Sequence, residues 1–318
     1  MIKNEADILS YIQSNIKTKS RNVAKSIGDD CAVIRTNSNS YFVITTDTSL
    51  LGPHFTADYS PYEIGYKCVA TNLSDIAAMG CVPKYIFMAI TIPSLDSKWI
   101  KSFYIGIKEL TSKHKVALIG GDTNKGPLSI SIQVIGINKA NILYRSGAKI
   151  NDDIYVTGKL GNARAALMVS KSRVYKNEYN LLKKYLRKPS PRIDVGLSIS
   201  KFANSCIDIS DGLLKDLGNI LFMSNLGADI NIDMIPFNPL IKKIIPKKKF
   251  YECLIGGGED YELCFTSSTK HRKKISSLST ALNVPITLIG KTTKNKISYF
   301  SNNKEVFFNF KGFDHFAS

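Results

Sequence analysis

The sequence has few of the side chains that most often bind transition metals or act as thiol catalysts. Only four of its 318 residues are histidine, and its six cysteines include no C-x-x-C pair, a spacing typical of zinc and thiol redox sites. Most of the cysteines lie within apolar runs, so we interpret them as buried, reduced thiols. We therefore expect neither a zinc site nor cysteine chemistry.

Long apolar runs are absent as well. The longest lies near Tyr85–Ile92 and is far too short to cross a bilayer. The N-terminal stretch MIKNEADILSYIQ carries acidic residues early and lacks a long apolar core, which argues against a signal peptide. We therefore expect a soluble, cytoplasmic protein with no membrane partner.

The familiar motifs of nucleotide and hydrolytic enzymes are missing too. The sequence contains no protein-kinase motif set, no G-x-G-x-x-G and no G-x-S-x-G. The segment Gly290-Lys291-Thr292 resembles the end of a P-loop, but Pro285 stands where that loop has its first glycine. A nucleotide enzyme with this sequence must bind phosphate in another way.

What the sequence does have is aspartate beside short apolar segments. Seven aspartates lie in loop-like stretches, mostly next to predicted strands: Asp29, Asp30, Asp47, Asp75, Asp122, Asp208 and Asp211. Carboxylates that a fold brings together repel one another unless they bind a cation, pair with Lys or Arg, or take up protons. An all-oxygen set favours a hard cation such as Mg²⁺, which usually accompanies a phosphate-bearing substrate. The first hypothesis is therefore a magnesium-dependent nucleotide enzyme.

Three of these stretches carry further groups suited to that chemistry. Thr45-Thr46-Asp47 adds hydroxyl ligands, and the two glycines of Gly120-Gly121-Asp122-Thr123 allow close approach of a phosphate. Asp208-Ile209-Ser210-Asp211-Gly212 places two acids where a strand gives way to a helix. Each stretch taken alone is also consistent with an ordinary turn, because glycine and aspartate favour turns.

The net charge of +17 raises a second hypothesis, a basic protein that binds nucleic acid and whose acids are merely structural. The basic residues are spread out, and the densest runs are Lys247–Lys249 and His271–Lys274. No basic stripe interleaved with aromatic residues and no DNA- or RNA-binding motif is present. We therefore interpret the charge as solvated surface and expect no nucleic-acid partner, although a positive field would attract polyphosphates.

Strands and helices alternate along the sequence. Ser60, Pro61 and Glu63 mark the start of a helix that can run towards Met79, and Val116–Ile119 is predicted as a strand that ends at Gly120. The pattern indicates an α/β or mixed α+β protein and does not decide whether the sheets are parallel. A polar, turn-rich segment at 145–153 predicts a boundary between two domains, residues 1–148 and residues 149–318.

Taken in order, nine stretches of the sequence resemble those of the thiamine-monophosphate kinase family. They are IGDDCAVI, TTDTSLLGPHF, YKCVATNLSDIAAMG, LIGGDTNKGPLS, RSGAKINDDIYVTGKLG, KPSPRI, IDISDGLLKDLGNI, GGGEDYELCFT and KGFDHFA. They extend from about residue 27 to the C-terminus, so the resemblance covers nearly the whole chain. The alternative within the same superfamily is another ATP-dependent enzyme such as aminoimidazole ribonucleotide synthetase, which the identity of the product would distinguish.

The resemblance implies a two-domain fold of the aminoimidazole ribonucleotide synthetase type. Residues 1–148 would bind ATP and Mg²⁺ and form a homodimer through their sheets, and residues 149–318 would form a C-terminal α/β domain. ATP would lie between the domains with several Mg²⁺ ions and phosphorylate thiamine monophosphate directly, giving thiamine diphosphate.

The resemblance also implies roles for individual residues. The metal ligands would be Asp30, Thr45, Thr46, Asp47, Asp75, Asp122, Asp208 and Asp211, with Asp47, Asp75 and Asp122 as the catalytic set. The ATP contacts would be Tyr104, Gly121, Asp122, Arg145 and Ser210. The thiamine-phosphate contacts would be His54, Glu259 and Phe313. Phe313 stands where the family often has Trp or Tyr, and it would stack on a thiamine ring; its alternative is a core aromatic.

Overall fold

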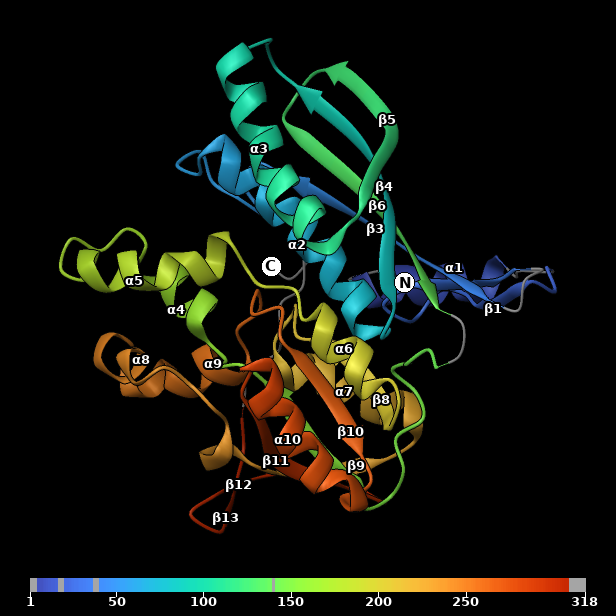
Figure 1. Ribbon diagram of the computed structural model, residues 1–318. Helices are drawn as coiled ribbons and strands as arrows, with labels where there is room; N and C mark the ends of the chain where they lie inside the picture. The colour runs from blue at the N-terminus through green and yellow to red at the C-terminus, as the bar shows by residue number, and fades with distance from the viewer. Residues whose placement is uncertain (1–4, 17–19, 37–39, 139–140, 309–318) are drawn as a thin grey trace.

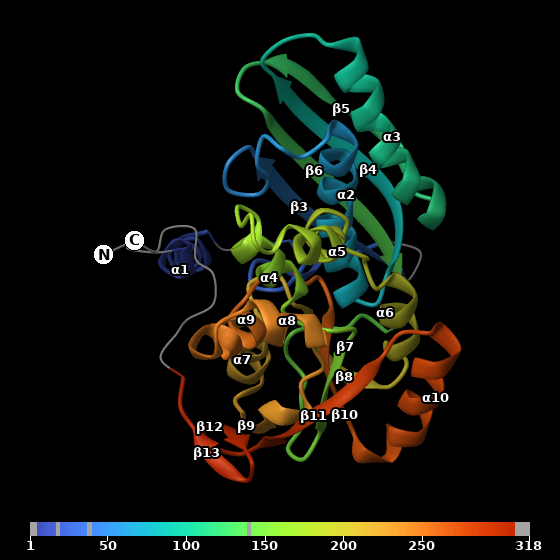
Figure 2. The same ribbon diagram turned by 90° about the vertical axis from the view of Figure 1, so that its left-hand side faces the viewer.

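The computed structural model describes residues 5–16, 20–36, 40–138 and 141–308. These residues form two sheets with their helices, one above the other in Figure 1. Helices α4 (Asn162–Val169) and α5 (Lys176–Arg187) lie at the level of the junction between the sheets (Figure 2). Within the described residues, no helix is both long and apolar enough to span a membrane.

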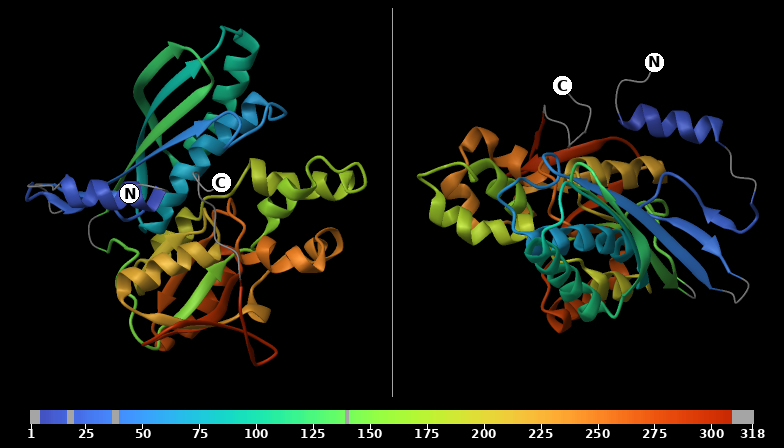
Figure 3. Two further views of the ribbon diagram at one scale, coloured as in Figure 1. Left: turned by 180° about the vertical axis from the view of Figure 1, so that it is seen from behind. Right: turned by 90° about the horizontal axis from the view of Figure 1, so that it is seen from above.

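The upper sheet has six strands and is antiparallel except for one edge pair, β4 and β5. Its order is β1 (Val23–Lys25), β2 (Ala32–Arg35), β3 (Tyr41–Leu50), β6 (Ser129–Asn138), β4 (Val82–Ile92) and β5 (Ala117–Lys125). Helices α2 (Pro61–Ala78) and α3 (Ser97–His114) cover one face, where Ile86, Ile130 and Val134 are buried. Helix α1 (Glu5–Asn15) and β1 lie at the side of the molecule (Figure 3).

The lower sheet has seven strands, and its one parallel pair is β9 and β12. Its order is β13 (Lys304–Val306), β12 (Ile297–Ser301), β9 (Gly227–Asn231), β11 (Ile286–Thr293), β7 (Asp153–Thr157), β10 (Leu263–Ser267) and β8 (Ala203–Asp208). Its further helices are α6 (Ile193–Ile199), α7 (Leu213–Ser224), α8 (Pro239–Ile244), α9 (Phe250–Ile255) and α10 (Arg272–Leu282), with short 3-10 turns η1 (Ile232–Met234), η2 (Lys247–Lys249) and η3 (Thr269–His271). The mixed class is confirmed, and the mostly antiparallel pairing makes it α+β.

Helix α2 joins the two sheets and begins where the sequence predicts. The Ser60 hydroxyl accepts a hydrogen bond from the Glu63 N–H, and the Glu63 carboxylate accepts one from the Ser60 N–H at 2.8 Å, which completes a capping box. The helix packs against the upper sheet and α3, and it also contacts α5, α6 and β8. Leu73 and Ile76 are fully buried, and each such side chain contributes about 1.5–3 kcal/mol to stability.

Strand β5 extends further than the sequence predicts. The strand expected to end at Ile119 continues beside β4 to Lys125, so Gly121 and Asp122 lie within a strand rather than a loop. Gly121 has a φ of 148°, and a Cβ at this position would lie 1.8 Å from the Met88 carbonyl oxygen. The glycine is therefore required for the close approach of β5 to β4, a role that the sequence did not indicate.

We expect Gly121→Ala to destabilise the protein by about 2–4 kcal/mol, because the added methyl group must displace strand β4. The control is Gly218→Ala in α7, where a Cβ would meet no atom within 4 Å and helix propensity should add about 0.5–1 kcal/mol of stability. Urea unfolding measures both changes. Equal stability of Gly121→Ala and the wild type would contradict this account of β5.

Candidate active site

A cavity of about 1890 Å³ lies at the junction of the two sheets. Its walls include residues 45–50 of β3, Lys67, Thr71 and Asp75 of α2, and the loops around Asp208 and Glu259. Pockets that hold one small ligand typically measure about 300–1,000 Å³. The cavity is therefore large enough for two substrates side by side.

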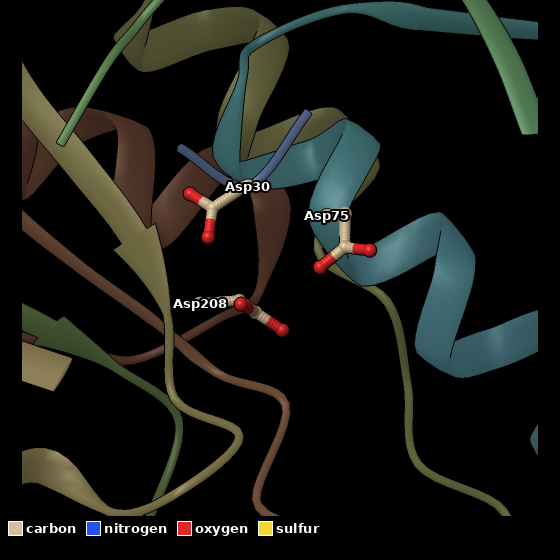
Figure 4. Close-up of side chains that lie close together, drawn as sticks. All are labelled: Asp30, Asp75 and Asp208. Atoms are coloured by element: carbon tan, nitrogen blue, oxygen red, sulfur yellow. The ribbon is translucent and has the colours of Figure 1, made fainter. Parts of the chain in front are cut away.

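Three aspartates from separate parts of the chain meet in this cavity (Figure 4). Asp30 precedes β2, Asp75 lies in the last turn of α2, and Asp208 is the last residue of β8. One carboxylate oxygen of each lies within 4.8 Å of those of the other two. The fold thus brings together three of the residues that the sequence marked as metal ligands.

Asp30 is held by a guanidinium group on one side only. Arg145 donates to its Oδ1 from Nη2 at 2.7 Å and from Nε at 3.1 Å. Its Oδ2 is buried and accepts no hydrogen bond from the described residues. Burial raises the pKa of Asp30 to about 6, against the attraction of Arg145. An unpartnered, buried carboxylate oxygen suits a ligand to a cation.

Asp75 and Asp208 accept hydrogen bonds from hydroxyl groups. Thr45 Oγ1 donates to Asp75 Oδ2 at 2.5 Å, and Ser74 Oγ donates to Asp208 Oδ2 at 2.7 Å. Burial, followed by the charge of Asp30, raises the pKa of Asp208 to about 8. Burial and the neighbouring carboxylates raise the pKa of Asp75 well above its usual range. The cluster therefore resists full ionisation unless a cation compensates it, and its all-oxygen donors suit Mg²⁺.

Other predicted metal ligands line the cavity outside this cluster. Asp47 lies on β3, and Asp211 forms an ion pair with Lys215 at 2.7 Å. Thr46 also lines the cavity, and its hydroxyl accepts a hydrogen bond from Gln133 Nε2 at 3.2 Å. Of these residues, Asp47 is near enough to the cluster for its charge to help raise the pKa of Asp75.

Three of the predicted ATP contacts do not line the cavity of this chain. Gly121 and Asp122 lie on the exposed edge strand β5, and β4 and β6 separate that strand from β3, which carries Asp47. At the usual strand spacing, β5 is roughly 14 Å from β3. Tyr104 on α3 is 39% exposed and also lies outside the residues that line the cavity. Within a single chain, Asp122 is therefore not brought to the aspartate cluster.

The remaining predicted contacts line the cavity with one exception. Arg145, Ser210, His54 and Glu259 are all part of its wall. His54 Nδ1 accepts a hydrogen bond from the Leu50 N–H at 3.1 Å. The last candidate, Phe313, lies outside the described residues.

Sequence reasoning missed two buried residues that support the site. Asp216 Oδ2 accepts hydrogen bonds at 3.0 Å from the backbone N–H groups of Asp211 and of the next residue, so it shapes the loop after Asp208. Lys67 lines the cavity on the same face of α2 as Asp75. The spacing of eight residues between them was a usable signal, because helix positions four apart share a face.

We expect Asp208→Asn to alter how stability responds to pH and to divalent cations. The pKa of Asp208 rises from 3.8 to about 8 on folding, so its contribution to stability decreases as the pH rises through this range. In EDTA, the Tm of the variant should therefore fall less than that of the wild type between about pH 5 and pH 8. Added Mg²⁺ at the higher pH should raise the wild-type Tm more than that of the variant. Thermal melts of the two proteins with the same pH slope and the same response to Mg²⁺ would contradict this expectation.

Comparison with known proteins agrees with the geometry. Residues 28–138 match the family model described as AIR synthase related protein, N-terminal domain. The thiamine-monophosphate kinase of Buchnera aphidicola subsp. Schizaphis graminum is 41% identical over 320 residues, which cover 98% of this chain and 99% of that protein. The thiamine-monophosphate kinase of Escherichia coli K12 is 37% identical, and the match covers 100% of both chains.

Solved structures show the same relationship. Thiamine-monophosphate kinase from Stenotrophomonas maltophilia K279a is 33% identical, with a TM-score of 0.80 and coverage of 94% of this chain and 96% of that chain. AaThiL complexed with AMPPCP and TMP is 28% identical, with a TM-score of 0.85 and coverage of 98% and 97%. Because thiamine-monophosphate kinases match the full length of this chain at 41% and 37% identity, the chain belongs to the thiamine-monophosphate kinase family.

Proposed function

We propose that this protein transfers the γ-phosphoryl group of ATP to the phosphate of thiamine monophosphate and releases thiamine diphosphate and ADP. The observation that carries this proposal is the meeting of Asp30, Asp75 and Asp208 in a cavity large enough for two substrates. The full-length relatives named thiamine-monophosphate kinase support it, as does AaThiL, which was solved with AMPPCP and TMP.

The proposed ligands of several Mg²⁺ ions are all side chains that bind a cation through oxygen. They are Asp30, Thr45, Thr46, Asp47, Asp75, Asp122, Asp208 and Asp211, with Asp47, Asp75 and Asp122 as the catalytic set. When bound, such ions offset the repulsion between anionic phosphates. The raised pKa values of Asp30 and Asp208, caused mainly by burial, and the unpartnered Oδ2 of Asp30 support this assignment, because each marks a buried carboxylate whose negative charge is not fully compensated.

The proposed transfer is direct. An oxygen of the acceptor phosphate forms a bond to the γ-phosphorus while the bond from that phosphorus to the β–γ bridging oxygen breaks, and ADP leaves. The acceptor is already anionic near neutral pH, so the reaction needs no strong general base. Among the described residues that line the cavity, His54 is the only histidine. Its Nδ1 is already engaged by the Leu50 N–H, which suits a binding role.

The two substrates would occupy different ends of the cavity. The proposed ATP contacts are Tyr104, Gly121, Asp122, Arg145 and Ser210, of which Arg145 and Ser210 line the cavity of this chain. The proposed thiamine-phosphate contacts are His54, Glu259 and Phe313. Residues 1–148 would form the domain that binds ATP and Mg²⁺ and dimerises, and residues 149–318 would form the C-terminal domain that completes the cavity.

A homodimer formed through the six-stranded sheets would complete this site. The face of the sheet away from α2 exposes Phe42, Tyr85 and Phe87, each by more than a third. Strand β5 is an exposed edge, and β2 pairs with only residues 41–44 of β3, so residues 45–50 have no described partner strand on that edge. Apolar faces and free edges favour pairing between copies. Such pairing would bring Asp122 of the partner subunit to Asp47.

The central test is an assay of the purified protein with ATP, Mg²⁺ and thiamine monophosphate, which should yield thiamine diphosphate. Asp47→Asn should lower kcat by about 10²–10³-fold, because a charge that stabilises the transition state is lost, and should leave thermal unfolding almost unchanged. Asp229→Asn on the exposed part of β9 is the matched control and should keep wild-type activity. Absence of thiamine diphosphate with the wild type would refute the proposed function, whereas a fully active Asp47→Asn would remove only Asp47 from the mechanism.

Mixed subunits test the dimer. Asp47→Asn and Asp122→Asn should each be nearly inactive alone. After subunit exchange, half of the dimers are mixed and each has one site with both aspartates, so activity should recover to about a quarter of the wild-type value. Exchange verified by mass spectrometry without recovered activity would show that both residues act within one chain, and a monomer at assay concentration would refute the dimer.

A further inference from the structure

Lys67 is a buried cation that none of the roles above employs. It is only 3% exposed, and it forms part of the cavity wall. That group donates a hydrogen bond to the backbone oxygen of His54 at 2.9 Å and forms an ion pair with the carboxylate of Glu259. Lys67 and Glu259 are 192 positions apart in the sequence, so this contact joins the upper and lower halves of the molecule across the cavity.

The loop that carries Glu259 is also attached to the aspartate cluster. The Glu259 N–H donates to the Ser210 carbonyl oxygen at 2.8 Å. A Cβ at Gly258 would lie 2.3 Å from the same oxygen, so the close packing of the two loops requires glycine there. Because Ser210 follows Asp208 by two positions, the location of Glu259 is tied to that of the cluster.

The ion pair closes a ring of contacts around the cavity. Lys67 and Asp75 lie eight residues apart on α2, a separation of about 12 Å along the helix axis. Asp75 meets Asp208 in the cluster, the loop after Asp208 holds Glu259, and Glu259 returns to α2 through Lys67. One rigid helix and one ion pair therefore set the distance between the cluster and the Glu259 end of the cavity.

We propose that Lys67 is a positioning residue that holds the Glu259 carboxylate and the His54 carbonyl where the phosphate acceptor binds. This inference rests on the proposed function. Glu259 has a left-handed φ of 74°, a conformation that a non-glycine residue keeps only when its contacts stabilise it. Without the ammonium group, the Glu259 side chain loses its charged partner, and the acceptor loses its fixed place relative to the phosphoryl donor.

Steady-state kinetics of Lys67→Met with both substrates varied provides the test. We expect the KM for thiamine monophosphate to rise by about tenfold or more, the scale of one lost contact to a charged group. The KM for ATP should change by less than about threefold, because Lys67 lies about 12 Å along α2 from Asp75, whose cluster marks the proposed Mg²⁺ site. Lys67→Arg keeps the charge and should recover part of the loss.

Lys188 offers a matched control for damage to the junction between the two halves. Its ammonium group donates to the Tyr62 hydroxyl and to the Glu109 carboxylate, yet it lies outside the residues that line the cavity. Lys188→Met should lower the Tm and leave both KM values near those of the wild type. A thiamine-phosphate KM raised equally in Lys188→Met would show a general effect of the junction and would overturn the role of Lys67.

A double variant tests whether Lys67 acts through Glu259. The thiamine-phosphate KM of Lys67→Met with Glu259→Gln should match that of the worse single variant, since both changes break one contact. Effects that multiply would overturn the proposal, as would an unchanged KM in Lys67→Met or equal shifts for both substrates. If Lys67→Met does not fold, the same comparisons are made with Lys67→Gln, which also removes the charge. A wild type that forms no thiamine diphosphate refutes the proposed function and this inference together. If the wild type is active, a result against the expected KM values refutes only the role of Lys67.

Discussion

The site depends on the cost of holding three carboxylates together in a buried place. Carboxylate oxygens of Asp30, Asp75 and Asp208 lie within 4.8 Å of one another. In the described part of the chain, the guanidinium group of Arg145 donates hydrogen bonds to one of them, Asp30. Poorly hydrated charges of one sign must take up protons or be matched by cations. Because the three aspartates come from both halves of the molecule, the cluster forms only when the two sheets dock, and docking therefore creates the proposed catalytic centre.

Helix α2 makes this arrangement rigid. It packs on the upper sheet and α3 and also contacts α6 and β8 of the lower half, so its position is determined from both sides. Asp75 at one end of its cavity face enters the cluster, and Lys67 two turns earlier contacts Glu259. A phosphoryl transfer between two anions depends on positioning and electrostatics, and a single buried helix that carries both groups suits that demand.

Local sequence signals predicted the parts of the fold that depend on neighbouring residues. The Ser60 and Glu63 capping box appears in the structure as expected, because both residues lie within one turn. The Gly120–Asp122 segment was wrongly expected to form a loop, since two glycines usually interrupt a strand. Its pairing with β4 depends on a strand about thirty positions earlier in the chain, and no local pattern indicates such a partner.

By itself, the sequence determined the kind of chemistry, because oxygen donors, the scarcity of histidine and the order of the motifs are properties of the residues alone. It also indicated Asp30, Asp75 and Asp208 as ligands among eight candidates, but only the tertiary structure decided that these three form one cluster. The same is true of Asp122, which lies on an exposed edge strand, and of Lys67, which reaches Glu259. Each of these outcomes depends on strand register or on the docking of segments far apart in the chain, and neither is encoded by local spacing.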